Sequence, residues 1–202
     1  MAQEKLTRAQ LLAGLKRLDE LARKEGVLVD LTIYGGAALA LVYDLRDSTR
    51  DVDVAIHTQS EKALKMARLI AEENGWAPNW INDGVKGFLS AHEELDQVDA
   101  FNASTEGLCM SVASPRYLFA MKCMAMRTAD PDHPGDRDDI LRLANLVGIN
   151  SVEQALEMVS SFYPDNQVSA KVAFGVEEIL GSTSQEGQGH SPPERTGPGR
   201  GF

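Results

Sequence analysis

Two aspartates separated by a single valine, Asp51-Val52-Asp53, open a short apolar run that continues to Ile56. Because strand side chains alternate between two faces, both carboxylates are expected on one face, with their α-carbons about 6.5 Å apart. Carboxylates this close repel each other unless a cation lies between them. Mg²⁺ (or Mn²⁺) suits the pair, because these ions take oxygen ligands and Mg²⁺ is usually held by one or two carboxylates plus substrate phosphates. We therefore expect Asp51 and Asp53, the acid pair, to bind a metal ion.

A glycine pair, Gly35 and Gly36, precedes the acid pair and follows the apolar run 31–34. Glycine has no Cβ, so the backbone at this point can approach a ligand closely. Residues 37–43 have a helix-compatible sequence, and the N–H groups at the start of a helix suit a phosphate. A phosphate-binding turn next to a metal-binding strand predicts nucleotide chemistry.

The order of the two pairs resembles the signature of the nucleotidyltransferase superfamily of the DNA polymerase beta type. Fourteen residues separate Gly36 from Asp51. Gly36 stands where many members carry serine, so one hydroxyl contact to phosphate is expected to be missing. The resemblance implies that the acid pair holds metal and that Asp99, in the apolar run 98–101, is the third ligand or the general base. Two metal ions would then support in-line displacement of pyrophosphate. The alternative for Asp99 is a strand residue that faces solvent.

Three further side chains are candidates for phosphate binding. Thr49 and Arg50 come directly before the acid pair, where a hydroxyl and a guanidinium can reach a phosphate. Lys122 lies in the otherwise apolar segment 118–124. A charge there is costly unless paired, so Lys122 either extends outward or points into a polar site.

The segment 122–127, KCMAMR, followed by 136–143, DRDDILRL, resembles a pattern of bacterial nucleotidyltransferase-like proteins of the AbiEii toxin type. This likeness covers residues 30–165. It implies that Lys122 contacts the nucleotide phosphates and that Arg127 and Asp139 hold two halves of the molecule together or line the site. Asp136, three residues before Asp139, is a neighbour of it on the helix. The alternative for Arg127, Asp136 and Asp139 is a structural ion pair between helices.

The hydrophobic pattern predicts an α/β fold, with a small mixed β-sheet and its helices followed by a C-terminal helical bundle. We expect a nucleotidyltransferase-like core over 1–113, a helical region packed on it over 114–180, and a disordered tail over 181–202. The expected strands are 27–34, 51–56, 95–101 and 108–113, with one or two short strands in 76–89 broken at a hairpin-type turn at 82–84. The expected helices are 7–25, 61–73, 117–127, 136–147, 151–162 and 167–180.

Composition narrows the function classes. A net charge of −10 argues against a large nucleic-acid surface, which depends on clustered lysine and arginine. No apolar run reaches the length of a membrane span, so we expect a cytoplasmic protein with no membrane partner. Cys109 and Cys123 are too few for a disulfide framework and are expected to be buried free thiols.

The functional hypothesis is a Mg²⁺-dependent nucleotidyltransferase that moves a nucleoside monophosphate from an NTP to a hydroxyl. The acceptor is either RNA, such as a tRNA 3′ end, or a protein side chain. The resemblance implies a toxin–antitoxin or phage-defence setting, with a cognate toxin or antitoxin protein as partner. The alternative is a catalytically inactive protein of the same fold that binds a nucleotide or a partner, as an antitoxin does.

Overall fold

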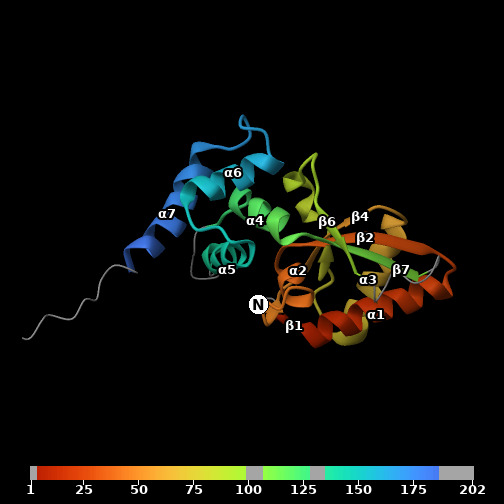
Figure 1. Cartoon of the computed structure of the whole chain (residues 1–202). Helices are drawn as coiled ribbons and strands as arrows, with labels where there is room; N and C mark the ends of the chain where they lie inside the picture. Colours follow the sequence, from red (N-terminus) through yellow and green to blue (C-terminus); the bar gives the residue numbers. More distant parts are fainter. Residues whose placement is uncertain (1–3, 99–106, 128–134, 187–202) are drawn as a thin grey trace, which may run out of the picture.

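The computed structural model describes residues 4–98, 107–127 and 135–186 and is a mixed α/β structure (Figure 1). The strands are β1 Leu6–Thr7, β2 Leu28–Tyr34, β3 Ser48–Thr49, β4 Val52–Ile56, β5 Ile81–Asn82, β6 Leu95–Gln97 and β7 Gly107–Ala113. The helices are α1 Arg8–Lys24, α2 Gly35–Leu41, α3 Ser60–Asn74, the 3₁₀ turn η1 Gly84–Phe88, α4 Pro115–Met124, α5 Arg137–Val147, α6 Val152–Phe162 and α7 Ala170–Glu186. The predicted fold class is therefore confirmed.

The main sheet has five strands in the order β5-β4-β2-β7-β6 and mixes both strand directions. β2 lies at its centre, antiparallel to β4 and parallel to β7, while the edge strand β6 runs antiparallel to β7. β1 and β3 form a separate two-stranded ribbon. The buried runs of β2 and β7 fit these central positions, because a strand flanked on both sides is largely shielded from water.

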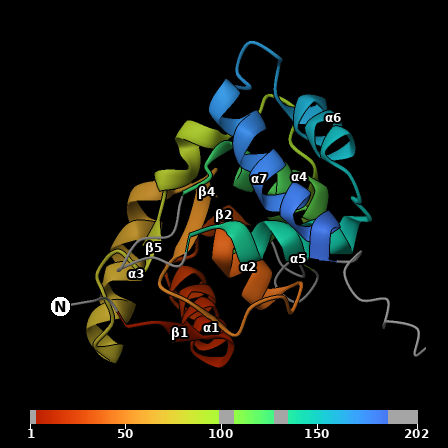
Figure 2. The same cartoon turned by 90° about the vertical axis from the view of Figure 1, so that its left-hand side faces the viewer.

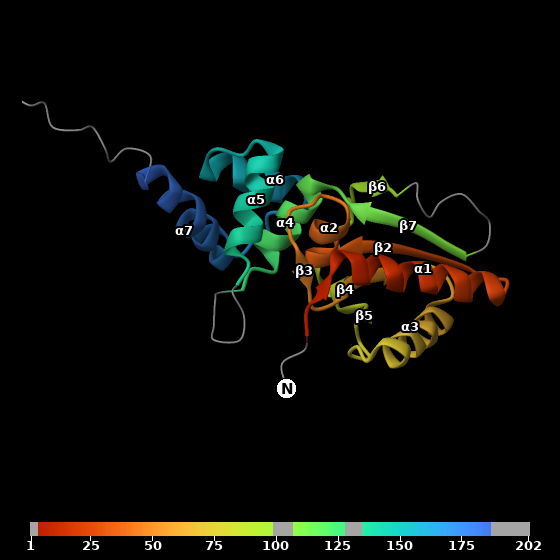
Figure 3. The ribbon, with the colours of Figure 1, turned by 90° about the horizontal axis from the view of Figure 1, so that it is seen from below.

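Helix α1 covers one face of this sheet and lies along β2 and β7 (Figure 3). Its apolar stripe, Leu11, Leu15, Leu18 and Ala22, is fully buried or nearly so. A capping box starts the helix, since the Thr7 side chain accepts from Gln10 N and the Gln10 side chain accepts from Thr7 N. Helix α3 packs beside α1. Apolar residues at helical spacing thus form the face of α1 that packs on the sheet.

One edge of the sheet gathers three chain segments that are far apart in sequence. β2 and β7 are parallel, so their last residues lie at the same edge, and β4 starts there because Asp53 pairs with Tyr34. A single residue, Ser114, joins β7 to α4. Its N–H donates to the Glu94 carbonyl, its hydroxyl donates to the Glu94 carboxylate, and its Oγ accepts from Tyr117 N. The helices α4 to α7 consequently pack at this edge (Figure 2).

One of the one or two short strands expected in 76–89 is present, but the hairpin-type turn predicted at 82–84 is wrong. β5 has two residues, runs parallel to β4 and leads into η1. The Asn82 side chain accepts from Gly84 N at 2.9 Å, so the Asn-Asp-Gly sequence starts a 3₁₀ turn instead of reversing a strand. Trp80, which is fully buried and donates its indole N–H to the Ala67 carbonyl, fixes the chain just before this turn.

Two helix ends also differ from the prediction. α4 ends at Met124, three residues before Arg127. α7 continues to Glu186, beyond the expected end at 180, so the first six residues of the expected disordered tail are helical. The remainder of that tail lies outside the described residues, as do Asp99 and the end of the strand expected over 95–101.

Two simple properties complete the description. Within the described residues, no helix has both the length and the apolarity needed to cross a membrane. Cys109 and Cys123 are free thiols, the first half-buried and the second buried. Burial raises the pKa of Cys123 to about 12, so its thiol stays protonated at neutral pH.

Gly14, in the middle of α1, leaves room for two tryptophans. A Cβ added there would lie 2.6 Å from Cη2 of Trp80 and 2.8 Å from Cζ3 of Trp76. We expect Gly14→Ala to lower the free energy of unfolding by about 1–3 kcal/mol, measured by urea denaturation. The matched control is Gly181→Ala in α7, where a Cβ meets nothing within 4 Å. Because alanine has a higher helix propensity than glycine, Gly181→Ala should raise the free energy of unfolding by up to about 1 kcal/mol. Equal effects of the two substitutions would contradict the packing explanation.

Candidate functional site

The acid pair lies where β4 begins, at the edge of the sheet that faces α4. Val52 and Val54 are fully buried on the opposite face, and Asp51 and Asp53 are half-buried. Both aspartates line one cavity of about 360 Å³, the charged cavity, which is also lined by lysine and arginine side chains. The alternation expected from the sequence therefore brings the two carboxylates to the same space.

The surroundings of Asp53 disfavour its charge. Burial and the neighbouring charge of Asp51 raise the pKa of Asp53 above its ordinary value, and Asn82, Lys122 and Arg127 offset this only in part. The Asn82 amide donates to Oδ2 of Asp51 at 3.3 Å. Two carboxylates that share a site and are only partly compensated by nearby cations are a typical arrangement for a divalent metal ion.

At each position of the glycine pair, a neighbouring side chain leaves no room for a Cβ. Gly35 has φ +60°, and a Cβ on it would lie 2.7 Å from Oδ2 of Asp53, so the Asp53 carboxylate packs directly against the Gly35 backbone. A Cβ on Gly36 would lie 2.7 Å from Oγ1 of Thr49 and 3.0 Å from Nη1 of Arg46. The Thr49 hydroxyl thus occupies the space that a serine at position 36 would need. Thr49 therefore places a hydroxyl close to where a serine at position 36 would have placed one.

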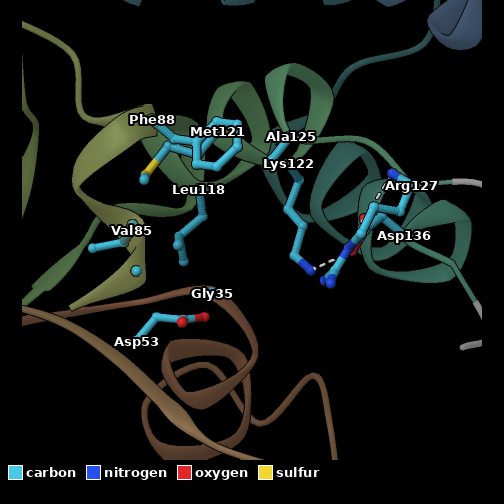
Figure 4. Close-up of a pocket in the computed structure, with 11 residues that line it drawn as sticks. Gly35, Asp53, Val85, Phe88, Leu118, Met121, Lys122, Ala125, Arg127 and Asp136 are labelled. Carbon is cyan, nitrogen blue, oxygen red and sulfur yellow. Dashed lines mark hydrogen bonds and ion pairs between the residues drawn. The ribbon is translucent and has the colours of Figure 1, made fainter. Parts of the chain in front are cut away.

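Lys122 points inward and is held by two aspartates of the next helical segment. Its Nζ lies 2.7 Å from Oδ1 of Asp136 and 2.9 Å from Oδ2 of Asp139, and its side chain is 12% exposed. Oδ2 of Asp136 also accepts from the backbone N–H of Arg127 at 2.9 Å. Figure 4 shows Lys122 and Arg127 both directed at Asp136. Burial alone would raise the pKa of Asp136, but the Lys122 charge and these hydrogen bonds outweigh it and hold that pKa below its usual value.

The ion pair between helices, the structural alternative for Asp136 and Asp139, is therefore present. A helix over the expected range 117–127 would place Lys122 and Arg127 on different faces. They reach the same aspartate because α4 ends at Met124 and Arg127 lies beyond it, where its N–H donates to Asp136.

Arg46 is the residue that the sequence analysis missed. Its Nη1 lies 3.0 Å from Oδ2 of Asp139 and its side chain is 27% exposed. The loop between α2 and β3 is thereby tied to α5. Arg46 lies in a segment without hydrophobic period, so no sequence pattern marked it. The one sequence signal for Arg46 was its place between the glycine pair and the acid pair, four residues before Arg50. Lys5 also lines the charged cavity.

Most of the predicted site residues line one place. The charged cavity is lined by Gly36, Thr49, Arg50, Asp51, Asp53, Lys122, Arg127 and Asp136. Gly35 lines an adjoining cavity, and Asp139 reaches the group through its ion pair with Lys122. Asp99 lies outside the described residues, so its predicted role as third carboxylate stays a prediction.

The two carboxylates fit a magnesium or manganese ion whose remaining ligands come from a substrate and from water. Among the described residues, no three histidine, cysteine, aspartate or glutamate side chains come together as a metal cluster. Asp51 and Asp53 supply two carboxylates, a number that Mg²⁺ uses when phosphate oxygens and waters complete its shell. The cations around them suit the anionic part of such a substrate.

The contact between Gly36 and Thr49 can be tested with a double mutant. We expect Gly36→Ser to lower the free energy of unfolding by about 1–3 kcal/mol, because the new side chain displaces Thr49 and Arg46. Thr49→Ala in the same protein should recover most of that loss, giving a coupling energy of about 1 kcal/mol or more in urea denaturation. Strictly additive effects of the two substitutions would show that they do not compete for space.

The charge of Asp53 should cost stability when metal is absent. A raised folded-state pKa means that the folded protein binds this proton more tightly than the unfolded chain does. Stability from Asp53 therefore increases as the pH falls through that raised pKa toward the ordinary value of 3.8. In EDTA at neutral pH we expect Asp53→Asn to raise Tm, and the gain should shrink as the pH is lowered.

Asp136→Asn is the matched control with the opposite sign. The pKa of Asp136 is lowered, so its carboxylate stabilises the fold above the ordinary aspartate pKa, and this contribution is lost as the pH falls through the folded value. Asp136→Asn should lower Tm at neutral pH. If both asparagine variants shift Tm in the same direction, the assigned electrostatics are wrong.

Comparison of the chain with family models, with curated proteins and with solved structures found no match. The likeness to nucleotidyltransferases therefore depends on the glycine pair, the acid pair and the Lys122 segment themselves. What these residues do together is a matter for a proposal and its test.

Proposed function

We propose that this protein is a Mg²⁺-dependent nucleotidyltransferase that transfers a nucleoside monophosphate from an NTP to a hydroxyl group. The observation that carries the proposal is the acid pair, which opens into a cavity of about 360 Å³ together with Lys5, Arg46, Arg50, Lys122 and Arg127. With Asp136, three carboxylates and five cations line the cavity. The acid pair with cations around it suits a ligand that combines a divalent metal with a polyphosphate.

The residues divide into two roles in this proposal. Asp51 and Asp53 would hold the metal, which when bound neutralises phosphate charge and orients the reacting groups. The Thr49 hydroxyl and the Arg50 guanidinium would bind phosphate oxygens from the side of β3. Lys122 has three N–H donors, and its ion pairs with Asp136 and Asp139 engage two of them; as far as the described residues go, the third can donate to a phosphate oxygen.

The reaction would be a displacement at the α-phosphorus. The oxygen of the acceptor hydroxyl forms the new bond, the bond to the bridging oxygen breaks, and pyrophosphate leaves. The hydroxyl proton passes to a carboxylate, the role that the resemblance gives to Asp99. The acceptor is RNA, such as a tRNA 3′ end, or a protein side chain, and a toxin–antitoxin or phage-defence setting remains part of the proposal.

Thermal denaturation with each NTP, with and without Mg²⁺, tests the binding step. Ligand at a hundredfold over its Kd adds about 2.7 kcal/mol, which raises Tm by about 5–10 °C for a chain of this size. We expect this shift to require Mg²⁺ and to be lost in Asp51→Asn/Asp53→Asn. Glu73→Gln, an exposed charge on α3 that pairs with Arg17, is the control and should keep the shift.

Transfer of label tests the chemistry. The protein is incubated with α-³²P-labelled NTPs and either tRNA or cell protein, and a γ-labelled NTP is the control. Label from the α position alone should reach the acceptor, and the double asparagine variant should lose at least about a hundredfold of the rate. A metal-dependent Tm shift without transfer would favour the catalytically inactive nucleotide-binding alternative. The absence of both would refute the nucleotide site.

A further inference from the structure

A second cavity of about 280 Å³, the apolar cavity, adjoins the charged one. The two share Asp53, Lys122, Arg127 and Asp136 in their walls. The rest of its lining is apolar or lacks a side chain. It comes from the start of α2, from η1, and from α4 with the residue after it: Gly35, Gly84, Val85, Phe88, Leu118, Met121 and Ala125. In Figure 4 Val85, Phe88, Leu118 and Met121 lie on one side, Lys122, Arg127 and Asp136 lie on the other, and Asp53 lies below the apolar group. One connected space therefore has an apolar end and a charged end.

Phe88 is the large side chain at the apolar end, and it is unusually open. It is 44% exposed although it lines a cavity. Its main chain is held from the helical part of the molecule, since the Tyr163 hydroxyl donates to the Phe88 carbonyl at 2.6 Å. Two residues on, Ser90 N donates to the Tyr117 hydroxyl at 2.7 Å. The position of the ring is thus set by hydrogen bonds that do not involve the ring itself.

We propose that the apolar cavity holds the nucleobase of the NTP, with Phe88 as its principal contact. This proposal rests on the proposed function and names the half of the substrate that the acid pair does not bind. A nucleotide has the same division as the joined cavities, with a flat, largely apolar-faced base at one end and phosphates at the other. Base–aromatic stacking contributes to binding for every base, because each has a π-face.

The composition of the wall also fixes the selectivity. Valine, phenylalanine, leucine, methionine and alanine side chains donate and accept no strong hydrogen bonds, so these side chains do not distinguish one base from another by hydrogen bonding. Apolar pockets discriminate weakly, whereas sites that hydrogen-bond their substrate reject an analogue by factors of about 10⁴ or more. The protein therefore accepts ATP, GTP, CTP and UTP with affinities within about tenfold of one another.

Calorimetric titration with the four NTPs and with inorganic tripolyphosphate, all with Mg²⁺, tests this assignment. Phe88→Ala should weaken binding of every NTP by about tenfold to a hundredfold and leave tripolyphosphate binding unchanged. Phe88→Tyr keeps the ring and should keep the affinity. The matched control is Leu69→Ala on α3, a side chain of similar exposure, 43%, that lies outside both cavities and should change nothing.

The outcomes separate this inference from the function on which it rests. If Phe88→Ala binds the NTPs as tightly as the unmodified protein, the base does not lie against Phe88 and the inference fails while the triphosphate site stands. A preference of a thousandfold or more for one NTP would refute the inference that the apolar wall does not select among the four bases. If the unmodified protein binds neither NTP nor tripolyphosphate, the proposed function fails and the inference with it.

Discussion

The structure depends on how one buried cation is paired. Lys122 belongs to a helix whose other side chains are mostly buried, and its ammonium is kept there by Asp136 and Asp139. A buried ion pair gains little net stability over an apolar pair, but it fixes geometry, because any other arrangement leaves a charge unpaired. Arg46 joins from the sheet side through Asp139. The spacing between the sheet edge and the helices α4 and α5 is thereby set by charge pairing, and both cavities lie in that space.

The same network limits what the cations can do for a ligand. Each aspartate that holds Lys122 in place also neutralises part of its charge, so the field at the acid pair is weaker than the number of lysines and arginines suggests. The raised pKa of Asp53 shows this balance, since burial and Asp51 together outweigh Lys122 and Arg127. The aspartates that position Lys122 therefore also reduce the positive charge that it offers to a ligand. A ligand that brings its own metal would make up for that reduction, because the metal compensates the acid pair directly.

Local sequence signals predicted much of the fold and of the candidate site. Residues at helical spacing defined α1, and alternation around Val52 placed both aspartates on one face. Gly36 needed the structure, because its requirement comes from Thr49 and Arg46, which are distant from it along the chain. The end of α4 and the 3₁₀ turn at Gly84 were missed for a related reason. Each is decided by one hydrogen bond to a polar side chain, and periodicity carries no information about such bonds.

The joint at Ser114 has a consequence for domain closure. Many enzymes of two parts bind substrate by swinging about a hinge, and a hinge needs a few residues whose backbone angles are free to change. Here β7 passes into α4 through one residue, and both its main chain and its hydroxyl are already bonded to Glu94 and Tyr117. These bonds restrain the backbone at Ser114, which makes it a poor hinge between the sheet and α4. Under the proposed function a nucleotide would bind without closure about this joint, so little binding energy would be diverted to conformational change there, and selectivity by induced fit would be correspondingly small.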